Sequence, residues 1–324
     1  MKKRAAVLYL ALIAGLVLIV FGWYSASFLT YGAGTESDSS TATETLTIPI
    51  VTNTATPKAD IPQIFDGDRA YADVQAQVDM GPRTPGSEGH AKVREWMRAE
   101  LESAGWLVEI QKTERMGHPI YNIIAKRNDQ APQVILAAHY DTRLAADQDL
   151  DESKRTEPVP GANDGASGVA VLLELARTLP KDTEPIWLVF FDAEDNGNID
   201  GWDWLLGSRA FVEEVPVQPQ AVIVLDMIGD ADLNIFLEQN SNPTLSAEIW
   251  SKAAELGYED KFIQTRKYSM LDDHTPFLEK GIPAVDIIDF DYPYWHTTED
   301  TPDKVSAESL SAVGNTLWHW ISER

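Results

Sequence analysis

Acidic and histidine residues stand at the ends of several short apolar segments of this chain. His139 and Asp141 follow one such segment, Glu194 and Asp195 follow a second, and Asp226 ends a third. A single segment that ends in an acid means little, because Asp is common in turns. Three such endings among five predicted strands are hard to explain as surface solvation, and they indicate that these side chains form a site.

Two loops add groups of the same chemical kind. Asn163-Asp164-Gly165 comes directly before a predicted helix, and Trp295-His296-Thr297 follows the last predicted strand. Carboxylates and imidazoles suit zinc in a catalytic site, which typically has three protein ligands and one open position. A bare cluster of carboxylates would repel itself, and a divalent cation removes that repulsion. The pattern therefore predicts a metal site built from oxygen and imidazole.

The neighbouring acids Glu194 and Asp195 cannot share one task. Side chains that alternate along an extended segment point in opposite directions, so both cannot ligate the same metal. One is expected to bind the metal while the other faces the substrate and moves a proton.

Composition narrows the chemistry further. The chain has 324 residues, no cysteine, and 26 Lys+Arg against 51 Asp+Glu, which gives a net charge of −25. Without cysteine, disulfide frameworks, thiolate zinc sites, thiol nucleophiles and iron–sulfur clusters are excluded. The negative charge repels phosphates and disfavours nucleic acid as a partner.

The elements that would position these groups alternate between two periodicities. Short apolar runs predict strands at residues 121–125, 134–138, 186–191, 222–225 and 284–288. Helical spacing predicts helices at residues 65–80, 88–104, 168–179, 244–256 and 307–321, with Ser87 as a cap. This alternation indicates an α/β domain with a mixed, mainly parallel central sheet and helices on both faces. In such folds the site lies at the carboxyl ends of the strands.

The N-terminal part has a different character. Residues 2–4 are basic and precede an uncharged run over residues 5–23, which as a helix would span about 28 Å. We expect a single-pass anchor in the cytoplasmic membrane, with residues 1–4 in the cytoplasm and the catalytic domain outside it. A cleaved signal peptide is the alternative, with a weak cleavage site near Ala26. Residues 24–60, rich in Thr and Ser, predict a flexible tether, and residues 61–324 the catalytic domain.

From about Gly81 to the C-terminus, the chain resembles the zinc-dependent exopeptidases. This family contains co-catalytic aminopeptidases and glutaminyl-peptide cyclotransferases, and the motifs that carry the resemblance are His139-Tyr140-Asp141, Gly161-Ala162-Asn163-Asp164, Glu194-Asp195, Asp226 and His296. Within the family the chain is most similar to bacterial glutaminyl cyclases that share the fold of the animal enzymes. The stretches behind that similarity include His139-Tyr140-Asp141-Thr142-Arg143, Asp272-Asp273-His274-Thr275-Pro276 and Trp295-His296-Thr297-Thr298.

The resemblance implies conversion of N-terminal glutamine to pyroglutamate with release of ammonia, on peptides or proteins with a free N-terminus. It implies Glu194 as general acid and base, and Asp226 with Asp272 as a hydrogen-bonded carboxyl pair. It also implies a single zinc ion, held by Asp164, Asp195 and His296. The glutamine stem needs an apolar slot, for which Trp295 and either Trp202 or Trp204 are candidates. These aromatic residues could equally belong to the core.

A di-zinc aminopeptidase of the same fold is the alternative. There the residues matching His139, Asp164 and Asp226 would hold a second zinc, and Glu194 would activate a water molecule. In the cyclase interpretation His139 and Asp141 instead support the site from behind its ligands. Trp295 and Asp272 favour the cyclase, whereas the retained His139 permits a second metal. A catalytically silent binding domain is a third hypothesis, which the intact Glu194 disfavours.

Overall fold

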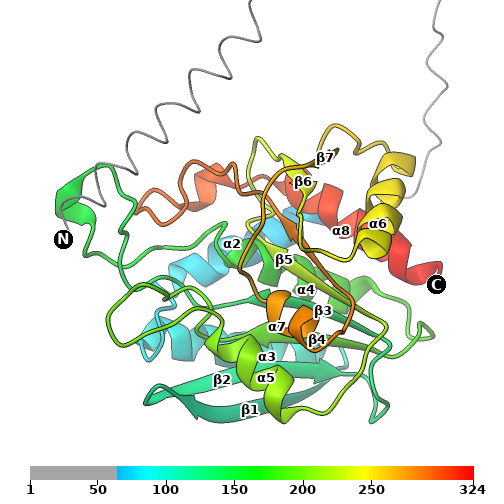
Figure 1. The fold of residues 1–324 in the computed structure, drawn as a ribbon, viewed down its shortest axis with the longest axis horizontal. Coiled ribbons are helices and arrows are strands. Elements are labelled where there is room, and N and C mark those ends of the chain that lie inside the picture. The colour runs from blue at the N-terminus through cyan, green and yellow to red at the C-terminus, as the bar shows by residue number, and fades with distance from the viewer. Residues whose placement is uncertain (1–63) are drawn as a thin grey trace, which may run out of the picture. The chain divides into compact units, whose positions relative to one another are not determined.

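The structure of the protein is a computed structural model, and it describes residues 64–324. These residues fold around a mixed six-stranded sheet with the strand order β1-β2-β4-β3-β5-β8 (Figure 1). Strands β3, β4, β5 and β8 are parallel, while β2 runs antiparallel to β4 and β1 antiparallel to β2. The six strands are β1 (Leu107–Arg115), β2 (His118–Lys126), β3 (Val134–His139), β4 (Ile186–Phe191), β5 (Ala221–Asp226) and β8 (Ala284–Ile288). A separate parallel pair consists of β6 (Ile235–Leu237) and β7 (Phe262–Arg266). The predicted α/β class is confirmed.

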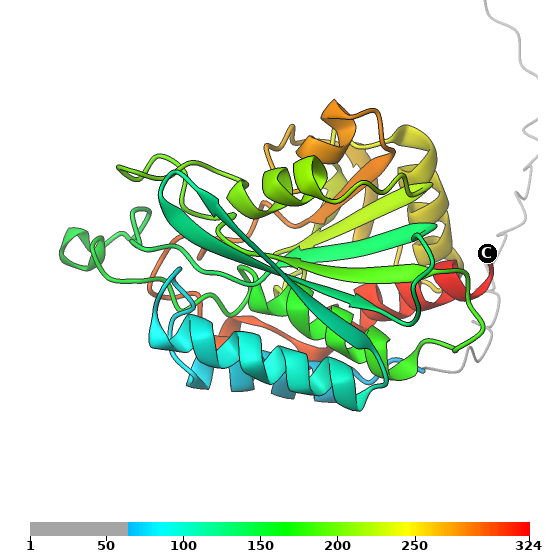
Figure 2. The same ribbon diagram turned by 90° about the horizontal axis from the view of Figure 1, so that it is seen from below.

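Helices cover both faces of the sheet, as predicted (Figure 2). On one face, strand side chains such as Leu136 pack with α2 (Gly67–Asp79), α3 (Glu88–Ser103), α4 (Ala166–Thr178), α6 (Pro243–Glu255) and α8 (Ala307–Ser322). On the other face, alternate residues such as Ile135 pack with α5 (Leu206–Glu214) and α7 (Thr275–Glu279). Because β3, β4, β5 and β8 are buried on both faces, their sequences read as continuous apolar runs.

Helix α3 begins where the sequence predicts. The Ser87 hydroxyl accepts a hydrogen bond from the backbone N–H of His90 at 3.1 Å, as an N-cap does. The strands predicted at residues 186–191 and 284–288 match β4 and β8 to the residue.

The sequence patterns do not reveal every element. Strand β1 has no fully buried residue, because it lies at the edge of the sheet and pairs only with β2. Its sequence is mostly polar, and only its half-buried Val108 and Ile110 pack against the core, so backbone pairing with β2 holds much of the strand. The helices α5 and α7 and the strands β6 and β7 are also absent from the prediction. They are short, so their periodicity is a weak signal.

The predicted anchor (residues 5–23) and tether (residues 24–60) lie outside the described residues. Within residues 64–324, the helices are too short or too polar to cross a membrane.

The strand order itself brings the predicted site together. Strand β3 lies between β4 and β5, and all three run in the same direction. Their carboxyl ends therefore meet at one edge of the sheet, and His139, the segment that begins at Asp192, and Asp226 emerge side by side.

Candidate active site

A cavity of about 230 Å³ lies at the carboxyl ends of these strands. Six of the polar residues predicted for the site line it, namely Asp164, Glu194, Asp195, Asp226, Asp272 and His296. The apolar part of its wall includes Trp204, Met270, Leu271, Phe290 and Trp295. The cavity thus combines polar groups with apolar walls, and Trp295 and Trp204 both stack beside His296.

The three residues predicted to hold zinc lie together. Asp164, Asp195 and His296 each offer a ligand atom, and these atoms lie within 4.8 Å of one another. His296 Nε2 is 2.7 Å from Asp195 Oδ1 and 3.8 Å from Asp164 Oδ2. Burial opposes protonation of His296, but the charge of Asp195 and hydrogen bonds to Asp147 and Asp195 raise its pKa to about 9. The site therefore attracts positive charge.

A buried oxygen atom without a hydrogen-bond partner supports the fit of this group to a metal ion. Asp195 Oδ2 is buried and has no hydrogen-bond partner within residues 64–324. Such an oxygen normally costs about 1–3 kcal/mol unless something satisfies it. Two carboxylates and one imidazole with an open position toward a cavity are a donor set that suits catalytic zinc.

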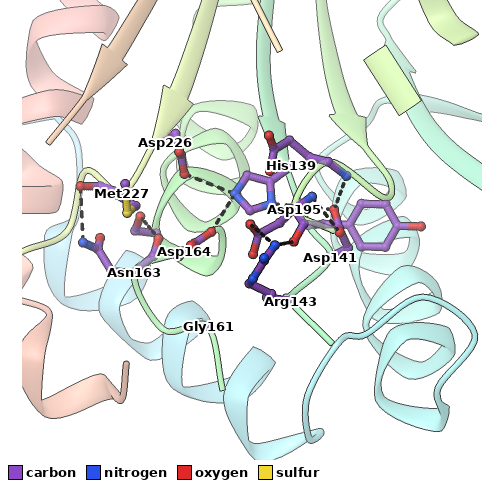
Figure 3. Close-up of polar contacts among 12 residues, drawn as sticks. His139, Asp141, Arg143, Gly161, Asn163, Asp164, Asp195, Asp226 and Met227 are labelled. Atoms are coloured by element: carbon purple, nitrogen blue, oxygen red, sulfur yellow. Dashed lines mark hydrogen bonds and ion pairs between the residues drawn. The ribbon is translucent and has the colours of Figure 1, made fainter. Parts of the chain in front are cut away.

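A second candidate group shares one of these residues. His139 Nε2 lies 3.1 Å from Asp164 Oδ1 and 3.1 Å from Asp226 Oδ1 (Figure 3). Burial raises the pKa of Asp226 to about 8; hydrogen bonding to His139 opposes this shift, and the charge of Asp272 adds to it. Because Asp164 belongs to both groups, the ligands for one metal and for two metals are both present.

Asp141 supports the turn that carries two site residues. Its carboxylate accepts hydrogen bonds from the backbone N–H groups of Glu194 at 3.0 Å and Asp195 at 3.3 Å, and from the side chain of Asn196 at 3.2 Å. Asp141 does not line the cavity. The structure thus places it as a support rather than as a ligand facing the cavity.

Glu194 and Asp195 diverge as expected. Asp195 contacts His296, whereas no residue of the described chain hydrogen-bonds the carboxylate of Glu194, which lines the cavity. Burial raises the pKa of Glu194 well above its usual value; the charge of His139 opposes this shift, and the charges of Asp195 and Asp272 add to it. Ala193, directly before Glu194, has a left-handed φ of 54°. This uncommon conformation turns the chain sharply just after β4, directly before the two acids.

Asp226 and Asp272 line the same cavity, but the predicted hydrogen bond between their carboxyl groups is not seen. Both line the cavity, and the charge of Asp272 contributes to the raised pKa of Asp226. No hydrogen bond joins the two carboxyl groups in the described structure; Asp226 contacts His139, and Asp272 accepts the N–H of Asp273.

The three candidate tryptophans are separated by the fold. Trp295 stacks on His296 with ring centroids 3.7 Å apart, and Trp204 lines the same cavity. Trp202 does not line it; this residue stacks on His118 at 3.6 Å and packs against a small apolar cluster. Of the two alternatives, the structure thus places Trp204 and not Trp202 in the cavity wall, because the loop turns the ring of Trp202 toward β2.

Two charged residues that sequence reasoning did not single out hold the metal group in place. The buried Arg143 donates to the carbonyl oxygens of Asp195 at 2.9 Å and Gly197 at 3.1 Å, and its guanidinium pairs with Asp147. Asp147 Oδ1 in turn lies 3.5 Å from His296 Nδ1. Arg143 and Asp147 stand only four residues apart, but their contacts with Asp195, Gly197 and His296 arise from the fold, and no local pattern marks them.

This arrangement predicts weaker zinc binding in Asp147→Asn. The change weakens the pair with Arg143 and the contact that orients His296, so zinc affinity should fall about 10- to 100-fold. Competition with a coloured chelator measures the zinc affinity. The matched control is Glu152→Gln in the same loop, whose side chain is exposed. Equal affinities of the two variants would contradict the role of Asp147.

Two further buried residues hold the loop that carries Asp164. Asp300 accepts hydrogen bonds from the backbone N–H groups of Asn163 at 2.8 Å and Asp164 at 3.2 Å. Arg83 donates to the carbonyl oxygens of Tyr140 and Gly161, and so ties this loop to the end of β3.

Known proteins share this architecture. A family model described as peptidase family M28 matches residues 122–321. A glutaminyl-peptide cyclotransferase from Bothrops jararaca is 31% identical over 301 residues, covering 76% of this chain and 80% of the relative.

Two solved structures are similar as well. Porphyromonas gingivalis glutaminyl cyclase has a TM-score of 0.76 and 38% identity, covering 80% of this chain and 99% of that one. A Zn-dependent exopeptidase from Parabacteroides distasonis has a TM-score of 0.75 and 33% identity, covering 80% and 99%. The family match spans more than half of the chain and includes the whole cavity edge of the sheet, so this chain belongs to peptidase family M28.

Proposed function

We propose that this protein is a zinc-dependent glutaminyl-peptide cyclotransferase. The observation that carries the proposal is the cavity itself, in which a zinc-type donor set and an unpaired Glu194 share one lining with the aromatic residues Trp204 and Trp295. The similarity to a solved glutaminyl cyclase over 80% of the chain supports it. The substrates would be peptides or proteins with glutamine at a free N-terminus.

The reaction needs no nucleophile from the protein. The α-amine nitrogen of the substrate attacks its own side-chain γ-carbonyl carbon, a C–N bond forms, and the bond to the amide nitrogen breaks to release ammonia. Glu194 is placed to accept a proton from the amine and to deliver it to the leaving nitrogen. When bound by Asp164, Asp195 and His296, zinc supplies a Lewis acid that polarises the carbonyl oxygen.

We propose one zinc ion per chain. In this arrangement His139 donates a hydrogen bond from Nε2 to Asp226 or Asp164 and supports the site from behind. Asp226 and Asp272 then share the polar side of the cavity near the reacting amine.

The apolar wall predicts a difference between two neighbouring tryptophans. Trp204→Ala should raise KM for a glutamine-initiated peptide about 10-fold, because a large apolar contact of the cavity is lost. Trp202→Ala is the matched control and should change KM by less than about 2-fold, since its ring packs on His118. Steady-state kinetics on both variants give the comparison, and a larger effect at Trp202 would refute this assignment of the wall.

A di-zinc aminopeptidase is the second candidate, favoured by the group His139, Asp164 and Asp226. Incubation of the purified protein with a Gln-initiated and a Leu-initiated peptide separates the two. Cyclisation lowers the mass of the first peptide by about 17 Da, the mass of ammonia, and leaves its length unchanged. Release of free leucine from the second would instead establish the peptidase.

We also propose that residues 5–23 anchor the chain in the cytoplasmic membrane, with the catalytic domain outside. The support is the uncharged run behind a basic flank. Fractionation of cells that express the full chain or a form lacking residues 1–23 tests this, and recovery of the full chain in the soluble fraction would contradict it.

A further inference from the structure

A second polar cluster lies directly behind the cavity. Its members are Glu238 after β6, His274 before α7, and Asp286 within β8, and all three are at most 4% exposed. None of them lines the cavity of the active site. The acids that face Asp286 from neighbouring elements are Asp226, Asp272, Asp273 and Glu238.

The imidazole stands between two carboxyl groups. His274 Nε2 lies 3.5 Å from Glu238 Oε2, and His274 Nδ1 lies 3.7 Å from Asp286 Oδ2. Across the described chain, both ring nitrogens and both Asp286 oxygens lack a hydrogen-bond partner, so the two contacts of the imidazole are longer than hydrogen bonds. Buried polar atoms are nearly always satisfied, and these groups are the nearest ones to satisfy one another.

The surroundings of Glu238 and Asp286 decide which of the two carboxyl groups ionises more readily. Glu238 accepts hydrogen bonds from the N–H groups of Met270 at 2.9 Å, Asn240 at 2.9 Å and Ser241 at 2.6 Å. Burial opposes ionisation of Glu238, but the contact with His274 and the hydrogen bonds from these backbone groups lower its pKa to about 2. Burial and the neighbouring acids raise the pKa of Asp286 well above its usual value. Glu238 thus ionises more readily than Asp286.

With a proton on Asp286, its hydroxyl lies 3.7 Å from His274 Nδ1, and the other ring nitrogen faces Glu238 at 3.5 Å. Negative charge then rests on Glu238, the residue with the most donors, where it is least costly.

The cluster of Glu238, His274 and Asp286 reaches the active site through one segment. Residues 270–272 line the cavity, and within them Leu271 is 52% exposed. Glu238 contacts both ends of this segment. It accepts a hydrogen bond from the N–H of Met270 at the start, and it lies 3.5 Å from His274 just beyond the end. We propose that Glu238, His274 and Asp286 are positioning residues that fix this wall, and with it Asp272, for the cyclisation reaction. The inference rests on the proposed function for its kinetic part alone.

Glu238→Gln is the first test. The amide nitrogen of Gln would face backbone N–H groups, so the anchor at Met270 should fail. We expect kcat/KM for a Gln-initiated peptide to fall about 10- to 100-fold, and hydrogen–deuterium exchange of residues 270–272 to accelerate about 10-fold. The matched control is Glu174→Gln, a buried glutamate that pairs with Arg69 on another element. It should lower Tm without changing exchange in this segment.

Two substitutions at Asp286 test the proton arrangement. Asp286→Asn keeps a donor toward His274 Nδ1 and should retain kcat/KM within about 3-fold, whereas Asp286→Leu should lose about 10-fold or more. Equal impairment of both variants overturns the arrangement. An extra metal ion per chain that disappears in Asp286→Asn also overturns it, since the cluster would then be a metal site. Unchanged exchange in Glu238→Gln overturns the positioning role, even if the wild-type protein forms no pyroglutamate.

Discussion

Glu194→Gln is expected to slow pyroglutamate formation about 10³-fold while the protein keeps its zinc. The glutamine amide cannot accept the proton of the attacking amine, and general acid–base catalysis contributes about 10²- to 10⁴-fold. The metal group is left intact because Asp195, and not Glu194, contacts His296. Ammonia release measured beside the zinc content of the same preparation checks both statements.

The matched control for this variant is Glu213→Gln, on an exposed glutamate of α5 that pairs with Arg115. It should leave the rate within about 2-fold of the wild type. Retained activity in Glu194→Gln would falsify the proton-transfer role, and loss of zinc from it would show that Glu194 is a ligand.

Removal of the metal is the second large effect. A protein freed of zinc by a chelator should lose cyclisation about 10³-fold or more, because the carbonyl is no longer polarised. One equivalent of zinc should restore the rate in full. Recovery that requires two equivalents would favour the second group of His139, Asp164 and Asp226 and the aminopeptidase chemistry.

Zinc should also stabilise the fold more strongly at higher pH. Burial is the main cause that raises the pKa of Asp195 to about 6 and that of Asp226 to about 8 in the metal-free protein. Unfolded Asp titrates near pH 3.9, so between roughly pH 4 and 8 the folded state binds more protons than the unfolded state. The metal-free protein therefore loses stability as the pH rises through this window.

Bound zinc replaces the proton of its ligand Asp195, and its charge favours the ionised form of the neighbouring Asp226, so the stabilisation it brings should grow over the same window. We expect the zinc-induced rise in Tm to be about 5 °C larger at pH 8 than at pH 5.5, measured by thermal unfolding with and without the metal. A smaller rise at pH 8 would show that the buried acids are already ionised without zinc.

The sequence by itself determined the class of fold and most of the polar side of the cavity. Strands β4 and β8 were predicted to the residue because both faces of each strand are buried, which leaves a continuous apolar run. Once parallel strands were expected, the rule that sites lie at their carboxyl ends placed Glu194 and Asp226 together. Local patterns are sufficient here because burial and strand ends are local features.

Only the tertiary structure decided what depends on contacts between distant segments. Trp202 and Trp204 are equivalent in the sequence, and the path of one loop turns the first onto His118 and the second into the cavity. Asp147 meets His296 and Glu238 meets His274 across long stretches of chain. The direction of a loop side chain and the partner of a buried charge follow from the packing of the whole fold, for which no periodicity of the sequence is a signal.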